Sequence, residues 1–125
     1  MTRTQLEEYI AETYNAEPEH PWAPDTDHTV FRHRDNRKWF AVVMEIEKDR
    51  LGIDGGGTIC IVNLKCDPMM IGSLLCEDGI YPAWHMNKTH WMSAAVDGCP
   101  DEDKLRFLLD FSYDLTAKKT RRKPN

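Results

Sequence analysis

The first hydrophobic pattern in the chain has the period of an α-helix. Apolar residues recur every three or four positions over residues 5–15, so they fall on one face and predict an amphipathic helix. The residues on this face are Leu6, Tyr9, Ile10 and Tyr14. Thr4 and Glu7 have the spacing of a capping box and predict the start of the helix. Three prolines within residues 16–27 then predict a loop, which Trp22 anchors against the core.

Runs rich in β-branched and aromatic residues come next, and they predict strands at 29–34, 37–47 and 58–66. Asp35 and Asn36 separate the first two runs, and both residues tolerate the left-handed backbone of a tight turn. The first two strands are therefore predicted to form a hairpin. Three consecutive glycines precede the third strand and predict a mobile turn, because they lack the spacing of a phosphate-binding loop.

The second half of the chain predicts two more helices and one more strand. Asp67 and Pro68 are typical of an N-cap and a first-turn proline, so a short helix is predicted from there to about Cys76. Residues 90–96 are predicted to form a strand. The last helix is predicted to begin after Pro100, where three carboxylates complement the positive end of the helix dipole.

The last helix carries a broad apolar stripe. Its predicted inner residues are Leu105, Leu108, Leu109, Ser112 and Leu115. Phe107 and Phe111 widen the stripe, and Ser112 is expected to bond back to the preceding turn. The resulting order of elements, α-β-β-β-α-β-α, predicts an α+β fold. We expect an antiparallel sheet with the helices packed on one face, in a two-layer sandwich.

Length and charge add a division of the chain into a body and a tail. A chain of 125 residues with 41% hydrophobic residues can fold around one core. We therefore predict a single domain over residues 1–117, followed by a basic tail at 118–125. The tail holds five of the sixteen basic residues and no acidic ones, so residues 1–117 carry a formal net charge of −10. An acidic body matches a phosphate backbone poorly, and nucleic-acid binding would need a local basic patch.

The cysteines and the N-terminus indicate where the protein works. Four cysteines, Cys60, Cys66, Cys76 and Cys99, lack any paired spacing and are predicted to be small core residues in a reducing compartment. The N-terminus lacks the apolar segment of a signal peptide, and no apolar run approaches the ~20 residues of a membrane span. We therefore expect a cytoplasmic protein without a membrane partner.

Motifs for metal binding and catalysis do not emerge from the residue spacings. His85 and His90 are five residues apart, but no cysteine lies at the short spacing that zinc sites favour. The serines lie outside any G-x-S-x-G elbow, and no nucleophile has a base at a chemically sensible spacing. The sequence therefore predicts a non-enzymatic protein with no metal site and no cofactor.

A local basic patch does occur, in the predicted hairpin FRHRDNRKWF. A basic β-ribbon can enter a groove of DNA or straddle its phosphates, so weak, salt-dependent DNA binding is the leading functional hypothesis. Its predicted contacts are Arg32, Arg34, Arg37 and Lys38, with Lys88 and His90 as secondary contacts.

The stretch YPAWHMNKTHWM, residues 81–92, supports a different hypothesis. Its aromatic side chains could form a surface that binds a protein or a small ligand, since exposed aromatic residues mark binding patches. The residues of this surface would be Tyr81, Trp84, His85 and Trp91. Trp91 lies on the predicted strand and is expected to be a core anchor, whereas Trp84 is expected to line a surface or a pocket.

Several segments together resemble the MmcQ/YjbR family of small bacterial proteins. The segments that carry the resemblance are HPWAPD around residue 22, KWFAVV at 38–43, LKCDP at 64–68, HMNKTHW at 85–91 and SYDL at 112–115. Their order and number make a specific signature that covers nearly the whole chain.

The resemblance carries expectations for fold and function. It implies a CyaY-like, or frataxin-like, α+β fold, and DNA binding through a double-wing arrangement of β-hairpins. The basic hairpin at 32–38 and the glycine-rich loop at 48–57 would be those wings. Analogy with the frataxin-like fold also suggests a third hypothesis, divalent-metal binding by an acidic face of the first helix. Its candidate residues are Glu7, Glu8 and Glu12.

Overall fold

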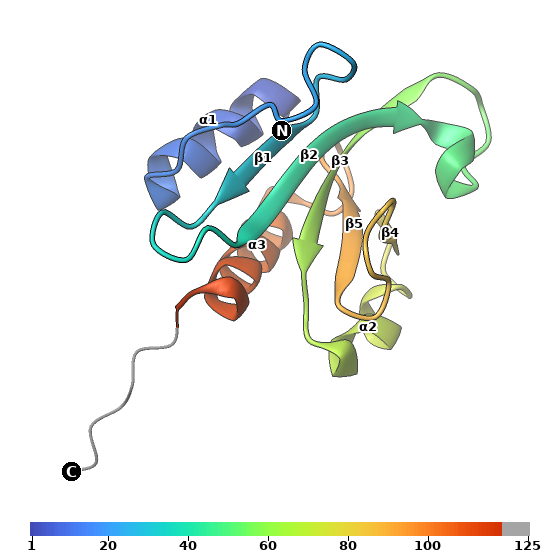
Figure 1. The fold of residues 1–125 in the computed structure, drawn as a ribbon. Coiled ribbons are helices and arrows are strands. Elements are labelled where there is room, and N and C mark those ends of the chain that lie inside the picture. Colours follow the sequence, from blue (N-terminus) through green and yellow to red (C-terminus); the bar gives the residue numbers. More distant parts are fainter. Residues whose placement is uncertain (119–125) are drawn as a thin grey trace.

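The computed structural model describes residues 1–118; residues 119–125, most of the predicted basic tail, lie outside the described part. Within it, three α-helices pack on a five-stranded antiparallel sheet of order β1-β2-β3-β5-β4 (Figure 1). The elements are α1 (Arg3–Tyr14), β1 (Thr29–Arg32), β2 (Trp39–Glu47), the 3₁₀ turn η1 (Lys48–Leu51), β3 (Thr58–Lys65), α2 (Pro68–Leu74), β4 (Ile80–Pro82), β5 (Trp91–Ala95) and α3 (Glu102–Thr116). The predicted α+β class, with helices on an antiparallel sheet, is confirmed. None of the helices among residues 1–118 is long and apolar enough to cross a membrane.

The sheet contains one strand more than the sequence predicted. β4 is only three residues long and pairs with β5, where Ile80 lies opposite Ala94. It forms the edge of the sheet, which is the position where Pro82 can be accommodated without losing a ladder hydrogen bond. So short a run has no periodicity of its own, and this explains why the pattern did not reveal it.

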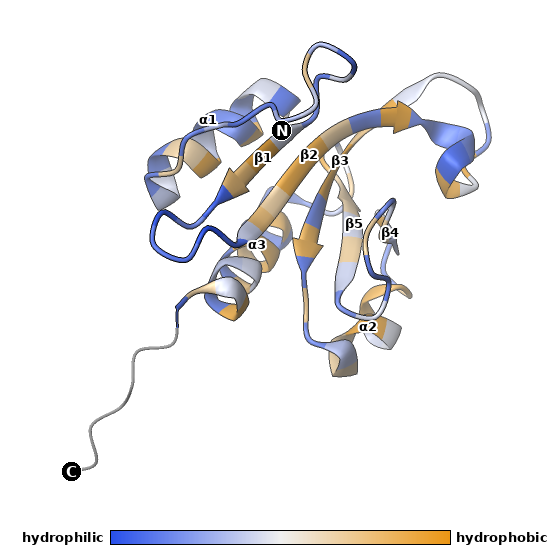
Figure 2. Cartoon of the chain, in the orientation of Figure 1, coloured by the Kyte–Doolittle hydropathy of each residue, from blue (hydrophilic) through white to orange (hydrophobic). Residues whose placement is uncertain are grey.

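Two apolar clusters lie on opposite faces of the sheet. All three helices contribute to the larger cluster, and Figure 2 shows the hydrophobic residues concentrated along the central strands. Its fully buried members include Leu6, Ile10, Phe31, Phe40, Val43, Leu64, Met92, Leu105 and Leu109. The smaller cluster contains Val30, Val42, Met44, Ile46 and Ile61. Because neighbouring residues of a strand point to opposite faces, Val42 and Met44 lie on the face away from the helices.

The start of α1 differs from the prediction. Thr2 is the N-cap, and its capping box is completed by Gln5 rather than by the predicted pair Thr4 and Glu7. The same spacing of polar residues occurs two positions earlier, so the local pattern allowed both starts. Glu7 instead accepts a hydrogen bond from Arg3 Nε at 2.8 Å.

The predicted two-residue hairpin is a longer connection, residues 33–38. The left-handed residue is Arg37, with φ of 65°, and not Asp35 or Asn36. Those two residues use their side chains in the turn, because Asp35 Oδ1 accepts from the Asn36 N–H and Asn36 Oδ1 accepts from the Lys38 N–H. Side-chain hydrogen bonds of this kind stabilise an Asx-type turn.

The inner stripe of α3 also differs at its end. Leu115, predicted to face inward, is 39% exposed, and Phe107 is half exposed. Thr116 occupies the buried position instead, where its hydroxyl bonds back to the Ser112 carbonyl at 2.8 Å. Because threonine is polar, the hydrophobic pattern did not indicate that Thr116 faces inward.

Ser112 does not bond to the preceding turn of its helix, as the sequence suggested. Its hydroxyl donates to the Phe40 carbonyl at 2.6 Å and accepts from the Lys65 N–H at 2.9 Å. The β2–β3 ladder ends one pair away, at Ala41 and Leu64. The serine therefore replaces the next backbone rung and ties α3 to two strands.

The predicted core position of the cysteines is confirmed for Cys66 and wrong for Cys76 and Cys99, while Cys60 is intermediate. Cys66 is buried and Cys60 half buried, whereas Cys76 and Cys99 are exposed, and all four are free thiols. Burial raises the pKa of the Cys60 thiol to about 12 and that of Cys66 to about 11. Cys76 and Cys99 lie in the segments around the end of α2 and before α3, which the hydrophobic pattern did not distinguish from the core.

Candidate aromatic binding site

Three tryptophans from separate parts of the chain meet on the sheet face that the helices leave uncovered. Trp22 comes from the loop after α1, Trp39 begins β2, and Trp84 follows β4. They surround a cavity of about 280 Å³, which we call the aromatic pocket. The other lining residues are Thr26, His28, Val42, Met44, Asn63, His85 and Met86.

The rings of the pocket meet mainly edge to face. The centroids of Trp22 and Trp39 lie 5.6 Å apart at an interplanar angle of 82°, and Trp22 contacts His28 in the same manner. Trp84 and His85 are 4.3 Å apart. Trp22, predicted as a core anchor for its loop, is 41% exposed and packs on this face rather than in the main core. The arrangement leaves ring faces and edges available to a further ring.

The wall that carries Trp84 is held by two buried polar side chains. Asn63, on β3, donates from Nδ2 to the Trp84 carbonyl at 2.8 Å. Ser93, on β5, accepts from the Trp84 N–H at 3.0 Å and hydrogen-bonds to Asn63 Oδ1. Because the backbone of Trp84 is fixed on both sides by strands, the pocket is preorganised and a ligand need not order this wall.

Burial affects two polar side chains that line the pocket, those of Thr26 and His28. The Thr26 hydroxyl is buried and has no hydrogen-bond partner among the described residues. Burial lowers the pKa of the His28 imidazole below its ordinary value, with Asp27 opposing this and Arg3 reinforcing it. His28 therefore favours its neutral form at pH 7, in which the ring can both donate and accept a hydrogen bond.

A groove continues from the aromatic pocket along the end of β2. It has a volume of about 300 Å³ and shares His28, Trp84 and His85 with the pocket. We call it the edge groove; its other lining residues are Glu45, Ile46, Glu47 and Arg50. The guanidinium of Arg50 lies 5.6 Å from the ring centroid of Trp84, within the range of a cation–π contact.

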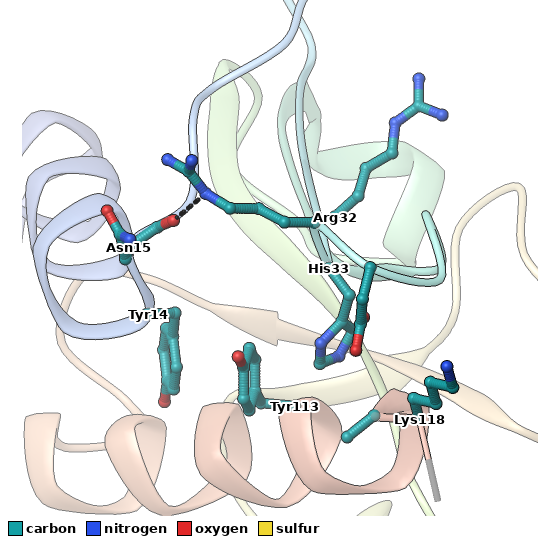
Figure 3. Close-up of a pocket in the computed structure, with 9 residues that line it drawn as sticks. Tyr14, Asn15, Arg32, His33, Tyr113 and Lys118 are labelled. Atoms are coloured by element: carbon teal, nitrogen blue, oxygen red, sulfur yellow. Dashed lines mark hydrogen bonds between the residues drawn. The ribbon is translucent and has the colours of Figure 1, made fainter.

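A second, more polar cavity of about 440 Å³ lies at the base of the hairpin (Figure 3). Figure 3 shows the rings of Tyr14, Tyr113 and His33 in a row; the centroids of Tyr14 and Tyr113 are 4.6 Å apart, and those of Tyr113 and His33 are 4.2 Å apart. His33 is buried, and its Nε2 hydrogen-bonds to Thr116 at 2.8 Å. This aromatic row joins the hairpin to α1 and α3, so we interpret the cavity first as a structural junction.

The arginines predicted to contact DNA lie at this cavity or beside it, and acidic or carbonyl groups face them. Arg32 Nε donates to Glu19 at 3.0 Å, and Arg37 lies 3.8 Å from the same carboxylate. Arg34 Nε donates to the Asn15 carbonyl, at the C-terminal end of α1. The loop after α1 therefore offsets part of the positive charge that the hairpin sequence indicated.

The other predicted DNA contacts lie at the same end of the sheet as the hairpin. Lys88 and His90 are exposed in the turn before β5, and Lys65 pairs with the first residue of β5. The glycine-rich loop at 48–57 lies at the opposite end of β2 (Figure 1). β2 has nine residues, so the two predicted wings are separated by the length of a strand of about 30 Å.

The predicted aromatic surface divides into two parts. Trp84 lines a pocket, as expected, and His85 lines it as well. Trp91, predicted as a core anchor, is half buried and belongs to neither apolar cluster. The register places it on the sheet face away from the helices, while Met92 enters the core. Tyr81 lies on β4 and does not line the pocket.

Three aromatic residues of the pocket were missed as site residues: Trp22, Trp39 and His28. The first two occur in the segments HPWAPD and KWFAVV, which had carried the family resemblance. Their place in these segments was the only signal in the sequence that Trp22 and Trp39 belong to a site, because neither segment is close to Trp84 along the chain.

The acidic face of α1 does not form a metal cluster in the described part of the chain. Among residues 1–118, no group of three or more His, Cys, Asp or Glu side chains is placed to hold a metal ion. Glu7 is engaged with Arg3, while Glu8 and Glu12 are exposed. The metal hypothesis gains no geometric support from this arrangement.

Comparisons with known proteins give one family and several similar proteins. The model of the family described as YjbR matches residues 11–115. The uncharacterized protein YyaQ of Bacillus subtilis is 34% identical over 116 residues, which is 93% of this chain and 98% of that protein. A crystal structure of a Pseudomonas syringae protein has 39% identity and a TM-score of 0.91 over 94% of this chain and all of its own. A Deinococcus radiodurans protein with a DUF419 domain has 25% identity and a TM-score of 0.70 over 98% of this chain and 83% of its own.

Proposed function

This chain belongs to the YjbR family, and from that premise we propose that it is a binding module whose aromatic pocket receives a flat aromatic group of its ligand. The observation that carries the proposal is the convergence of Trp22, Trp39 and Trp84 around one cavity. A sheet face of this size could be covered by aliphatic side chains alone. Three large rings around one cavity, one of them 41% exposed, are typical of a recognition site.

The chemistry of the pocket favours a ring over an aliphatic chain or an ion. The apolar floor of Val42 and Met44 supplies contact area, and the surrounding rings supply edge-to-face positions. Neutral His28 adds a hydrogen-bonding group beside these rings. In this function the site binds its ligand and does not catalyse a reaction.

Indole is a suitable probe because it is a flat aromatic ring. Its binding can be followed by NMR, since the side-chain N–H signals of the four tryptophans of the chain can be observed separately. We expect indole to shift the signals of Trp22, Trp39 and Trp84 with a Kd in about the millimolar range, as befits so small a ligand. The signal of Trp91, which lies outside the pocket, should not move.

A pair of variants sharpens the indole experiment. Trp84→Ala removes one wall and is expected to weaken indole binding by about tenfold, the equivalent of about 1.4 kcal/mol. Trp91→Ala is the matched control and should leave the affinity unchanged within about twofold. Equal shifts of all four signals, or none at about 10 mM indole, would show that the pocket does not bind rings.

DNA binding through the basic hairpin is a second candidate function. The observation that favours it is the common location of Lys38, Lys65 and Lys88 at one end of the sheet. Because Glu19 forms ion pairs with two neighbouring arginines and offsets one of their two charges, and because the body carries a net charge of −10, we propose that any such binding is weak and depends steeply on salt.

Fluorescence anisotropy with duplex DNA across a salt series tests this second function. The double variant Arg34→Glu, Arg37→Glu is expected to abolish binding at about 50 mM salt, because it reverses two cations at the hairpin. The double variant Glu8→Gln, Glu12→Gln on the exposed side of α1 serves as a control outside the hairpin. DNA binding is rejected if the wild type does not bind at the lowest salt, or if reversing the arginines has no effect.

A further inference from the structure

The second strand of the sheet is longer than its outer neighbour. β1 pairs with β2 only as far as Val43, which lies opposite Thr29. β2 then continues to Glu47 with β3 on one side and no strand on the other. Figure 1 shows this part of β2 curving away beyond the end of β1. An open sheet edge of this kind can pair with another chain.

The hydrogen-bond pattern identifies which backbone groups face the open edge. The backbone N–H and C=O of Val30 both bond to Glu19, on the side of β1 away from β2. The backbone groups of the neighbouring residue Thr29 must therefore face β2. Its partner Val43 therefore directs its N–H and C=O toward β1. Since these directions alternate along a strand, Glu45 and Glu47 direct theirs to the same side.

The other side of β2 leads to the same assignment. The Lys48 N–H bonds to the Gly57 carbonyl at 3.0 Å, across the ladder to β3. Residues at even positions near the end of β2 therefore face β3, and odd positions face away from it. No hydrogen bond joins the backbone of Glu45 or Glu47 to another group among the described residues on that outer side. Both residues are exposed, and the edge groove runs beside them.

Side chains along this edge alternate between two environments. Met44 and Ile46 lie in the smaller apolar cluster, on the face that carries the aromatic pocket. Glu45 and Glu47 point to the other face, where Asp27 adds a carboxylate near Glu45 through the shared ion pair with Arg3. A strand added at this edge would thus send every second side chain toward the pocket and the remaining ones toward carboxylates.

We propose that the open edge of β2 pairs with an extended peptide segment of a partner protein, which inserts an aromatic side chain into the aromatic pocket and sets lysine or arginine side chains against Glu45 and Glu47. The inference rests on the proposed function, because the peptide supplies the ring that the pocket receives. Continuity of the edge groove with the pocket through His28, Trp84 and His85 allows one segment to use both. Main-chain hydrogen bonds would provide affinity, and the alternating side chains would provide specificity.

A second copy of this chain fits the edge less well than a basic peptide does. Two copies paired through this edge would bring Glu45 and Glu47 of each chain near those of the other. Their acidic bodies, each with a net charge of −10 over residues 1–117, would add repulsion. The charge at the edge therefore favours a cationic partner.

The test uses a fluorescent peptide of alternating lysine and valine with one central tryptophan. Glu47→Pro removes the N–H that faces the edge and leaves the ladder to β3 intact, because proline is tolerated where the N–H faces solvent. Glu47→Ala is the matched control, since it removes the carboxylate and keeps the N–H. We expect Glu47→Pro to weaken peptide binding about tenfold or more, and Glu47→Ala only about threefold.

Indole binding separates this inference from the proposed function. Both Glu47 variants should retain the indole-induced shifts, which also verifies that they are folded. A peptide methylated on alternate backbone nitrogens, tested on the wild-type protein, should bind about tenfold more weakly or worse. In hydrogen exchange, the amides of Glu45 and Glu47 should exchange fast in the free protein and slowly with peptide bound, while those of Met44 and Ile46 stay protected throughout.

Three results would overturn the inference alone. The first is retention of indole binding without peptide binding, which would leave the proposed function intact. The second is equal peptide affinity of Glu47→Pro and Glu47→Ala. The third is a concentration-dependent dimer in which the Glu45 and Glu47 amides are already protected, because then a second copy occupies the edge. Failure to bind either indole or peptide would reject the proposed function together with the inference.

Discussion

Replacement of Gly79 by alanine is expected to destabilise the protein by more than about 4 kcal/mol, which is a large part of the stability of a typical domain. Gly79 has φ of 82°, a conformation that side chains with a Cβ rarely adopt. An added Cβ would lie 2.1 Å from the Cys99 carbonyl oxygen and 2.6 Å from Pro100 N. These are backbone atoms of the segment that leads into α3, so they cannot move aside as a flexible side chain could.

Gly72→Ala is the matched control for this substitution. Gly72 lies within α2, and a Cβ there would meet nothing within 4 Å. Alanine at that position is expected to stabilise the protein by about 0.5–1 kcal/mol through its higher helix propensity. Urea unfolding followed by circular dichroism gives both values. A Gly79→Ala variant within about 1 kcal/mol of the wild type would show that the segments around residues 79 and 99 separate at little cost.

Ser112→Ala is expected to cost about 2–4 kcal/mol, although it removes a single oxygen atom. The serine hydroxyl is the hydrogen-bond partner of two buried backbone groups, the Phe40 carbonyl and the Lys65 N–H. Alanine would leave both without a partner in a core where water does not replace the hydroxyl, and each such group costs about 1–3 kcal/mol. Ser112 itself is fully buried, so the lost interactions are not screened by solvent.

Two measurements identify the cause of this loss. Ser73→Ala, at an exposed position of α2, is the control and should change the stability by less than about 0.5 kcal/mol. In hydrogen exchange, the Lys65 amide should lose protection in Ser112→Ala more than the Leu64 amide, which faces β5. A loss of less than about 1 kcal/mol would mean that β2 and β3 close the gap by pairing directly at this point.

The elements that sequence reasoning located correctly are those with local signals. Asp67 caps α2 and Pro68 follows it, as the composition of that turn predicted. The period of apolar residues located α1 and α3, since 3.6-residue periodicity is a property of neighbouring positions. The family resemblance is confirmed, and it rested on short segments whose order along the chain is itself part of the sequence.

The features that were missed or misplaced depend on distant residues. Arg32 and Glu19 belong to segments that seemed separate, a basic hairpin and a proline-rich loop, and only the fold pairs them. Trp91 was expected in the core because strands bury large residues, but which face of β5 meets the helices depends on its register with β3. A shift of one residue in that register would have placed Trp91 inside and Met92 outside.

By itself, the sequence determined the class of fold, the location of the main helices and strands, and the presence of an unusual number of aromatic residues near Trp84. Tertiary structure alone decided that Trp22 and Trp39 join Trp84 in one pocket and that β2 extends beyond β1 to leave Glu45 and Glu47 at an open edge. The physical reason is the range of the interactions involved. Helix periodicity and capping act over a few residues and can be recognised in the chain, whereas strand register and sheet order bring together residues that the chain keeps far apart.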